Sequence, residues 1–360
     1  MMRLMIGGTL VMAGLAAPAS AQLGQVAGRV RNAVDAVDQV KDLIITEQEE
    51  MAMGAAISEK LRQKYGVVQN QAVHKYVSLV GHVLAASSTR PALSWTFIVL
   101  DTDGVNAFAA PGGYIHITRG ALALIRNESE LAGVLGHELA HVTQKHTINA
   151  IRKSKTLDLG TTALSRSQLL DRVTDAAYES LLENNFDRGD ENSSDEIGIQ
   201  LSNAAGYAPS GLGSFLTKLA DRNKDLQERS GVFASHPETK SRLDRLKSQI
   251  SSKKLTATAT VAARYTATIT YAPTPVTAVA TAAPGAAATP AAPKPGDSRF
   301  GLGGLTSRLG GEKTGNQTVA SAGSRGVNPD RDAKGGPNPR AVAVTITAAD
   351  IAAFRQGITG

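Results

Sequence analysis

The chain has no cysteine among its 360 residues. This absence excludes a thiol nucleophile, a disulfide framework and lipid attachment at a lipobox cysteine. The sequence also lacks the G-x-S-x-G pattern that places a nucleophilic serine on a strand-to-helix turn. Any hydrolysis is therefore expected to proceed without a covalent intermediate on a cysteine or on a serine of this pattern.

Aromatic residues make up only 4% of the chain, and beyond its N-terminal segment there is no run of 18 or more apolar residues. The mature chain is therefore not predicted to span a membrane. Residues 22–254 carry 27 basic and 27 acidic side chains, whereas residues 255–360 carry 10 and 5. A balanced region of this kind argues against nucleic acid as a substrate, and the tail has too few clustered cations and aromatic residues to bind it.

The N-terminus has the pattern of a secretory leader. Arg3 precedes an apolar run over residues 4–17, and Ala19-Ser20-Ala21 fits an A-x-A cleavage site. Residues 1–21 are therefore predicted to be a signal peptide. We expect a periplasmic protein of a Gram-negative cell that is soluble or peripherally membrane-associated.

The most informative motif is His137-Glu138-Leu139-Ala140-His141, an H-E-x-x-H sequence. On a helix, the two histidines lie one turn apart on the same face, so both imidazoles can bind one Zn²⁺ with Glu138 beside them as general base. The pattern predicts a zinc hydrolase, most simply a peptidase.

The segment around this motif is typical of a helix that begins near Glu128. Asn127 can cap it, with Glu130 at capping-box spacing. An apolar stripe follows at helical spacing, made of Leu131, Leu135, Leu139 and Val142. Gly133 and Gly136 weaken a helix, which suggests that another element packs closely against that side.

A catalytic zinc normally has three protein ligands, so a third must come from elsewhere in the chain. The best candidate is Glu191, which lies four residues before Asp195 in a second predicted helix. At this spacing the first carboxylate can bind zinc while the second accepts the free N–H of a ligand histidine. Without the upstream motif, such a pair is usually a solvated helix face.

Several motifs together resemble a known family. H-E-x-x-H is followed about fifty residues later by E-x-x-x-D, and then by His236-Pro237 and Arg242. This order is similar to the gluzincin metallopeptidases related to the CAAX prenyl endopeptidase and HtpX, particularly their soluble periplasmic BepA-like branch. The resemblance runs from about residue 47 to 246 and includes residues 106–109 and 111–114 before the active helix.

The resemblance implies roles for particular residues. His137, His141 and Glu191 would bind one zinc ion per chain, Glu138 would be the base, Asp195 would hold a ligand histidine, His236 would be an active-site group near the metal, and Arg242 would pair with the acidic ligand. The family usually has alanine where this chain has Ser194. His236 has a second interpretation, because Ser235 and Glu238 form a capping box that can simply start a helix.

The resemblance also implies that a substrate chain pairs with an edge strand just before the active helix. We predict this edge at residues 112–117, with Asn106, Gly112, Gly113, Tyr114 and Ile115 as substrate-binding residues. Main-chain hydrogen bonds along a strand edge would bind many unfolded chains without reading much of their sequence.

The predicted fold class is α+β, a zincin-like domain over residues 22–254 that is mainly helical. Residues 94–100 and 113–118 are expected to form strands beside the active-site helix. Residues 255–296 are expected to be a Thr/Ala/Pro-rich linker with a β-prone start, residues 297–339 a Gly-rich disordered segment, and residues 340–360 a short strand followed by a helix. Residues 147–186 are expected to form a lid over the cleft or to lie against a membrane.

Two functions from different classes remain open. The first is a zinc endopeptidase of the cell envelope that acts on misfolded or stalled proteins, with the outer-membrane assembly machinery as a possible partner. The second is a chaperone-like assembly factor whose metal site mainly binds rather than cuts. We also consider that the tail strand at residues 341–346 occupies the substrate edge and inhibits the enzyme.

Overall fold

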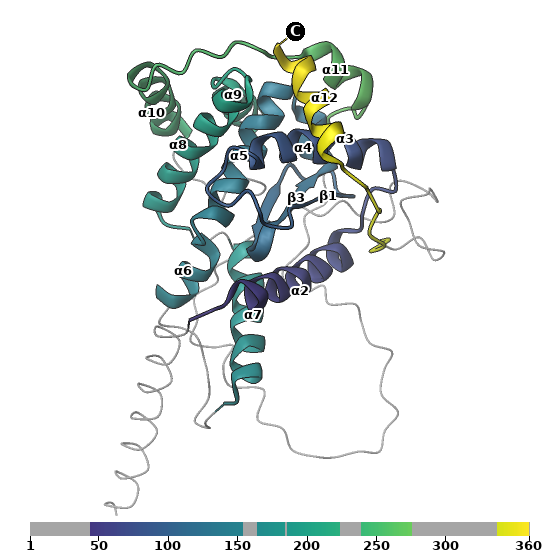
Figure 1. The fold of residues 1–360 in the computed structure, drawn as a ribbon, viewed down its shortest axis with the longest axis vertical. Coiled ribbons are helices and arrows are strands. Elements are labelled where there is room, and N and C mark those ends of the chain that lie inside the picture. Colours follow the sequence, from purple (N-terminus) through teal and green to yellow (C-terminus); the bar gives the residue numbers. More distant parts are fainter. Residues whose placement is uncertain (1–43, 154–163, 184–185, 224–238, 276–336, 360) are drawn as a thin grey trace, which may run out of the picture.

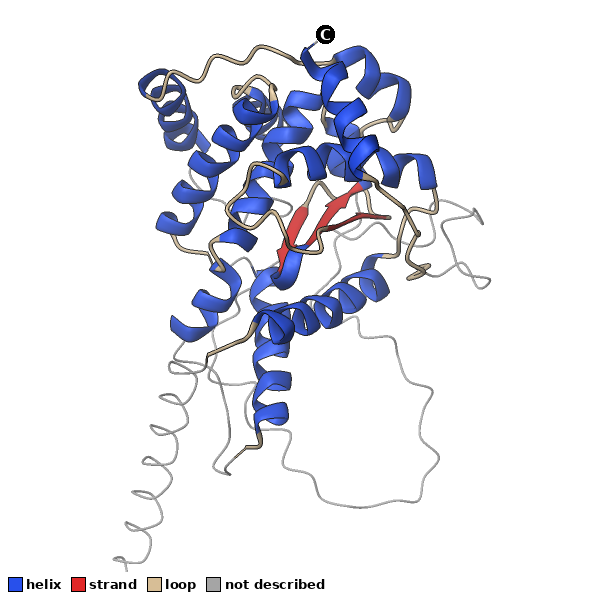
Figure 2. Ribbon diagram, viewed as in Figure 1, coloured by secondary structure: helices blue, strands red, loops and turns tan. Residues whose placement is uncertain are grey.

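A three-stranded sheet lies at the centre of the computed structural model, which describes residues 44–153, 164–183, 186–223, 239–275 and 337–359. Its strands are β1 (Thr96–Leu100), β2 (Ala107–Ala110) and β3 (Tyr114–Thr118), in the order β1-β3-β2. β3 pairs with β1 in parallel and with β2 antiparallel. Figure 2 shows this small sheet surrounded by helices, which confirms the predicted α+β class.

Alternate residues of each strand face opposite sides of the sheet, and both sides are covered by helices. On one side, Phe97 and Val99 join the larger apolar core. On the other, Ile98 and Leu100 join a second cluster formed largely with helices α2 (Glu47–Tyr65) and α7 (Arg166–Glu183). The larger core includes side chains from α3 (Gln71–Ala85), α4 (Arg119–Leu124), α5 (Glu128–Thr143), α8 (Arg188–Ala205) and α9 (Gly211–Asn223).

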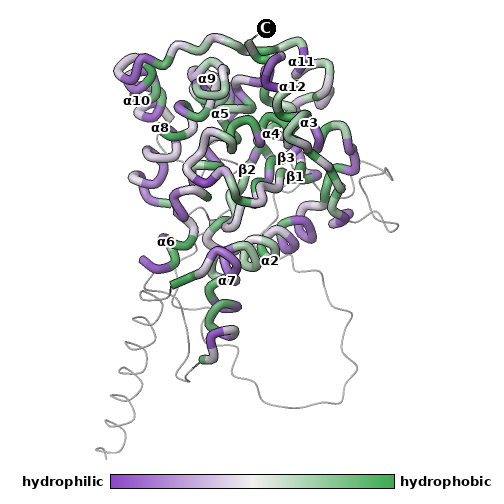
Figure 3. The backbone as a smooth tube through the Cα atoms, in the orientation of Figure 1, coloured by the Kyte–Doolittle hydropathy of each residue, from purple (hydrophilic) through white to green (hydrophobic). Residues whose placement is uncertain are grey.

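Hydropathy follows this arrangement. In Figure 3 the hydrophobic colour gathers on α4, α5 and the strands, whereas α10 (Thr239–Ser252) is largely hydrophilic. The apolar side of α7 carries Leu169, Val173, Ala177 and Leu181, which are buried in the second cluster. This apolar side packs against the protein itself and is not turned toward a membrane, whereas the lid over the cleft predicted for residues 147–186 stays a prediction. Among the described residues, no helix combines the length and the apolar composition needed to cross a membrane.

The predicted edge strand at residues 112–117 is wrong. β3 is the central strand, because β2, which the sequence analysis did not predict, pairs with its second side. The residues before β3 form the 3₁₀ turn η1 (Pro111–Gly113), which lies tightly against α2. A Cβ atom on Gly54 of α2 would lie only 1.9 Å from the carbonyl oxygen of Pro111, and Glu50 accepts a hydrogen bond from the Gly112 N–H at 3.2 Å.

The predicted boundary at residue 254 divides residues that pack together. Instead of a β-prone linker, residues 255–275 contain helix α11 (Ala262–Thr268), and Tyr265 and Ile269 are buried in the larger core. The Tyr265 hydroxyl donates a hydrogen bond to the carbonyl of Leu122 at 2.6 Å. The alternation of Thr with apolar residues favours a strand locally, but burial of this tyrosine beside α4 and α5 outweighs that preference.

The C-terminal element at residues 337–359 ends in a helix that lies beside α3 (Figure 1). Its extended part accepts a hydrogen bond from Val67 to Asn338 at 2.7 Å and is not part of any strand of the sheet. The predicted helix is α12 (Ala348–Thr359), and Thr347 and Asp350 exchange hydrogen bonds in a capping box at its start. The hypothesis that this tail occupies the substrate edge is therefore wrong in this structure.

Candidate metal centre

Helix α5 presents the two histidines of the predicted motif. The side chain of Asn127 accepts a hydrogen bond from the Glu130 N–H at 3.0 Å and so caps the helix at the predicted place. His137 and His141 are buried, at 0% and 1% exposure, and their Nε2 atoms lie 3.1 Å apart. Two buried nitrogens at this separation point toward the same small volume.

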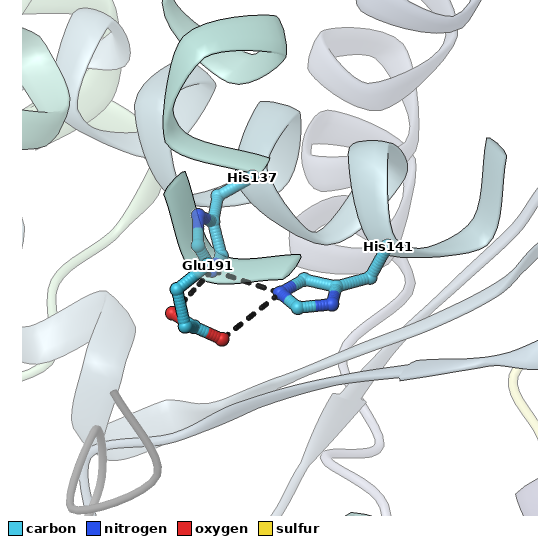
Figure 4. A group of neighbouring side chains, drawn as sticks. All are labelled: His137, His141 and Glu191. Atoms are coloured by element: carbon cyan, nitrogen blue, oxygen red, sulfur yellow. Dashed lines mark hydrogen bonds and ion pairs between the residues drawn. The ribbon is translucent and has the colours of Figure 1, made fainter. Parts of the chain in front are cut away.

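Glu191 approaches that volume from α8. Its Oε1 atom lies 3.4 Å from Nε2 of His141, and its Oε2 atom lies 3.6 Å from Nε2 of His137. Ligand atoms of the three residues lie within 4.8 Å of one another, and all three side chains are buried (Figure 4). The structure thus brings together the two histidines of the motif and Glu191, the carboxylate predicted as the third ligand.

Two glycines allow α5 and α8 to come this close. A Cβ atom on Gly136 would lie 2.9 Å from the carbonyl oxygen of Gly198, and a Cβ atom on Gly198 would lie 2.8 Å from the backbone nitrogen of His137. The backbones therefore touch where the helices cross. Gly133 fits against α9 in the same way, because a Cβ atom on it would lie 2.5 Å from the backbone nitrogen of Leu212. The close packing predicted from Gly133 and Gly136 is confirmed.

Asp195 and Arg242 form a charged pair behind His137. Oδ1 of Asp195 lies 3.0 Å from Nδ1 of His137, and Nε of Arg242, from α10, donates to Oδ2 of Asp195 at 2.8 Å. Arg242 is more distant from Glu191, at 3.8 Å. The main partner of Arg242 is therefore Asp195, whereas the resemblance implied the acidic ligand.

Burial and charge set the protonation of these groups. Burial alone would raise the pKa of Asp195, but hydrogen bonds from Arg242 and His137 outweigh it and lower this pKa to about 2. The carboxylate is thus ionised and can accept the Nδ1 hydrogen of His137. That leaves the Nε2 lone pair of His137 directed toward Glu191, which is the tautomer that a metal ligand needs.

Glu138 is the remaining member of the motif, and it is not among the converging ligand atoms. Burial raises its pKa to about 7, with a further contribution from the charge of Glu191 and opposition from His137 and Arg242. Its Oε1 atom is buried and makes no hydrogen bond to any described residue. A catalytic metal ion needs ligand atoms that converge on it and a nearby carboxylate that can accept a proton from bound water. The three ligand residues and Glu138 meet both needs, so the residues fit a divalent metal such as zinc.

His146 is a further neighbour of this site, and the H-E-x-x-H motif does not include it. In the structure α5 ends at Thr143, Lys145 adopts a left-handed backbone (φ 56°), and α6 (His146–Lys153) begins at His146. This turn brings Nδ1 of His146 to 3.1 Å from Nδ1 of His141. Burial lowers the pKa of His146 to about 4. No sequence pattern announces such a contact, because it depends on the turn between the two helices.

Three other histidines outside the motif have their partners elsewhere in the fold. His74 and His116 are buried and hydrogen-bonded, to the carbonyl of Val68 at 2.8 Å and to the Ser58 hydroxyl at 2.9 Å. His82 lies edge-on against the ring of Phe97. These three are therefore structural. His236 lies outside the described residues, so its role near the metal stays a prediction.

The outer edge of the sheet next to the site belongs to β2. Thr118 N–H donates to the Asn106 carbonyl at 2.8 Å, so Asn106 faces β3, and by alternation Ala107 and Ala109 direct their backbone groups away from β3. The Ala109 carbonyl accepts a hydrogen bond from Thr147 of α6 at 3.3 Å. The far edge of β1 is already occupied, since Val68 N–H donates to the Val99 carbonyl. Of the described strands, β2 thus keeps an outer edge whose backbone groups are directed away from the sheet.

Comparisons with known proteins agree with this geometry. The profile of peptidase family M48 matches residues 71–250, which is half of the chain. The Beta-barrel assembly-enhancing protease of Yersinia pestis is 29% identical over 208 residues, covering 54% of this chain and 42% of the relative. The protein of the same name from Escherichia coli K12 is 26% identical over 242 residues, covering 62% and 49%. Metalloprotease YcaL of Escherichia coli K12 is 30% identical over 164 residues, covering 42% and 61%. The chain thus spans less than half the length of both assembly-enhancing proteases.

Proposed function

The chain belongs to peptidase family M48, and we propose that it is a zinc-dependent endopeptidase that hydrolyses peptide bonds of misfolded or stalled envelope proteins. The observation that carries this proposal is the convergence of His137, His141 and Glu191, with the open carboxylate of Glu138 beside them. Two neutral imidazoles and one carboxylate form a ligand set of catalytic zinc, with a fourth position left for water or substrate.

Each side chain then has a distinct task. His137, His141 and Glu191 hold the metal, and Asp195 with Arg242 keeps His137 in the tautomer that binds through Nε2. Zinc bound there supplies Lewis acidity, which polarises a carbonyl group and makes water nucleophilic near neutral pH. Glu138 takes a proton from the attacking water and delivers it to the leaving amine. Because Glu138 is buried, a bound dication would also favour its ionised, proton-accepting form.

We propose that the substrate chain adds to the outer edge of β2. The outward N–H of Ala109 and carbonyl of Ala107 would pair with it, and unfolded proteins are the class of substrate that offers free backbone groups in an extended form. The contact is placed at β2 and not at residues 112–115, because Gly112 packs against α2 and Gly113 packs against Ser94. Tyr114 and Ile115 belong to the central strand. Asn106 keeps a supporting part, since its Oδ1 accepts the Ala107 N–H at 2.8 Å.

We further propose a periplasmic location and a connection to outer-membrane protein assembly. The leader pattern at residues 1–21, which lies outside the described residues, supports export. Two of the relatives are named for enhancing β-barrel assembly, which supports this connection. The periplasmic location and the connection to assembly do not depend on the zinc chemistry, and that chemistry does not depend on them.

The experiment that tests the proposed activity compares the wild type with Glu138→Gln on an unfolded casein, with zinc content measured in both. The variant is expected to keep its zinc, because Glu138 is not a ligand, and to lose at least about 10²-fold in cleavage rate. Glu179→Gln, an exposed change on α7, is the matched control and should leave both readouts unchanged. Comparable cleavage by Glu138→Gln at full zinc occupancy would contradict the mechanism. A zinc-loaded wild type that binds casein without cutting it would favour the chaperone-like function instead.

A further inference from the structure

The two metal-binding histidines have different partners on the side away from the metal. Nδ1 of His137 faces the carboxylate of Asp195 at 3.0 Å. Nδ1 of His141 faces another imidazole, with Nδ1 of His146 at 3.1 Å. The rings of His141 and His146 meet almost at right angles, with an interplanar angle of 81° and centroids 4.9 Å apart.

Two imidazole nitrogens at hydrogen-bond distance share a single hydrogen. Two N–H groups would repel each other, and so would two lone pairs. Nε2 of His141 faces Nε2 of His137 and the carboxylate of Glu191, so this nitrogen must carry the lone pair when a metal is bound. The hydrogen of His141 then lies on Nδ1, and Nδ1 of His146 is the acceptor.

The remaining contacts of His146 are compatible with this assignment. Its Nε2 lies 3.3 Å from Oγ of Ser193, which can accept the Nε2 hydrogen, and the carboxylate of Asp190 lies nearby at 3.6 Å. Oγ of Ser194 lies 3.3 Å from Nδ1 and can donate to the same lone pair. Ser194 is also the position where this chain departs from the usual alanine of the resembling family, so the substitution adds a polar contact to His146.

The residues around His141 and His146 hold the two imidazoles in place. Lys145 ends the turn after α5 in the left-handed region, and its ammonium group bonds Glu50 of α2 at 3.0 Å. The ring of Phe186 covers the other face of His141, with centroids 4.3 Å apart. His146 is itself only 5% exposed. The imidazole of His141 is therefore held by an acceptor at Nδ1 and by an aromatic ring on its face.

We propose that His146 is a positioning residue of the metal centre: it accepts the Nδ1 hydrogen of His141 and so directs Nε2 of His141 to the metal. The proposal rests on the metal site of the proposed function. Partners of this kind fix the tautomer and the ring orientation of a ligand histidine, and their loss typically lowers metal affinity about 10- to 100-fold.

Two substitutions at His146 separate hydrogen bonding from packing. His146→Asn places an amide oxygen near the position of Nδ1 and keeps an acceptor for His141. His146→Leu fills a similar space without an acceptor. His82→Leu removes a histidine of α3 that lies against Phe97 and is the control for the loss of a histidine away from the site. The measurements are the zinc dissociation constant by chelator competition, the visible spectrum with Co²⁺ in place of zinc, and the melting temperature of the metal-free proteins.

The expected result is a zinc dissociation constant raised about 10- to 100-fold in His146→Leu, with a changed Co²⁺ spectrum, and largely restored in His146→Asn. The metal-free melting temperatures of the two variants should be similar to each other, and His82→Leu should bind zinc like the wild type. The proposal is overturned if His146→Leu binds zinc as tightly as the wild type, or if both variants lose affinity equally, which would indicate packing alone. A wild type that fails to bind zinc would instead overturn the proposed metal site.

Discussion

Replacing Gly198 by alanine is expected to weaken the fold and the metal site together. A Cβ atom there would lie 2.8 Å from the backbone nitrogen of His137 and 3.1 Å from the carbonyl carbon of Gly136, whereas ordinary contacts begin at 3.4 Å. Because these atoms belong to a helix backbone, α5 and α8 must move apart by about half an ångström. Overpacking of this kind costs about 1–3 kcal/mol, and the better helix propensity of alanine returns about 1 kcal/mol.

The net loss of about 1 kcal/mol corresponds to a melting temperature lower by about 2–4 °C for a domain of this size. The same movement carries Glu191 and Asp195 away from His137, because they precede Gly198 on α8 by two turns and one turn. We therefore expect zinc binding to weaken by about 10-fold, an effect of the size seen when the support of a ligand is disturbed. Thermal unfolding of the metal-free protein and chelator competition measure the two effects separately.

Gly213→Ala is the matched control. Gly213 also lies in a helix, but its nearest neighbour would be a side-chain carbon of Leu243 at 3.6 Å, which is an ordinary contact. Alanine there should stabilise the protein by about 0.5–1 kcal/mol and leave zinc binding unchanged. If Gly198→Ala behaved like Gly213→Ala in both assays, the close crossing of α5 and α8 could not be what positions the third ligand.

Arg242→Ala is expected to lower the free energy of unfolding by about 3–5 kcal/mol, because it leaves Asp195 buried without its partner. Arg242→Lys should restore only part of this, since an ammonium group lacks the planar fork with which the guanidinium meets both oxygens. Denaturant unfolding measures both effects, and a loss below about 1 kcal/mol in Arg242→Ala would contradict the pairing. Deleting residues 337–360 should lower the melting temperature and should not raise the rate of casein cleavage at temperatures where the truncated protein stays folded. Faster cleavage by the truncated protein would instead support autoinhibition by the tail. Within that element, Phe354→Ala should cost about 1–2 kcal/mol, because this ring lies 3.9 Å from the guanidinium of Arg264; Gln356→Ala, an exposed change, should cost almost nothing in the same melt.

The metal ligands were predictable where the relation between residues is local. One helical turn separates His137 from His141, so a capped helix places them together whatever the rest of the fold does. The helix near the C-terminus was predictable for the same reason, because Thr347 and Asp350 cap it locally. Glu191 required more, because its spacing to Asp195 is common on solvated helices and only the accompanying motifs made it specific.

The strand order could not be predicted, because it depends on pairings between distant residues. β2 is four residues long and contains three alanines, so it gives almost no pattern of its own, and without it β3 looks like an edge. The helix at residues 262–268 was missed because the burial of Tyr265 decides its conformation. The contact of His146 with His141 depends on a single left-handed residue, Lys145, whose side chain is not one that usually marks such a turn.

The C-terminal element illustrates the same division. Its helix follows from local capping, but its place beside α3 follows from contacts with Val67, Lys75 and Arg264 that no local pattern indicates. Arg264 also pairs with the buried carboxylate of Glu128, the first residue of the active helix, which accepts a hydrogen bond from Tyr76 at 2.8 Å. The tail therefore contacts, through Arg264, the N-terminal end of the active helix, whereas the metal ligands lie in the second half of that helix.

The central claim is that three side chains from two crossing helices hold a catalytic zinc ion, and anomalous diffraction at the zinc absorption edge tests it most directly. Crystals of the protein loaded with one equivalent of zinc are predicted to show one strong anomalous peak, at about 2.0–2.2 Å from Nε2 of His137, Nε2 of His141 and an oxygen of Glu191. A protein that retains no zinc at this place, or a peak bound by other residues, would contradict the account.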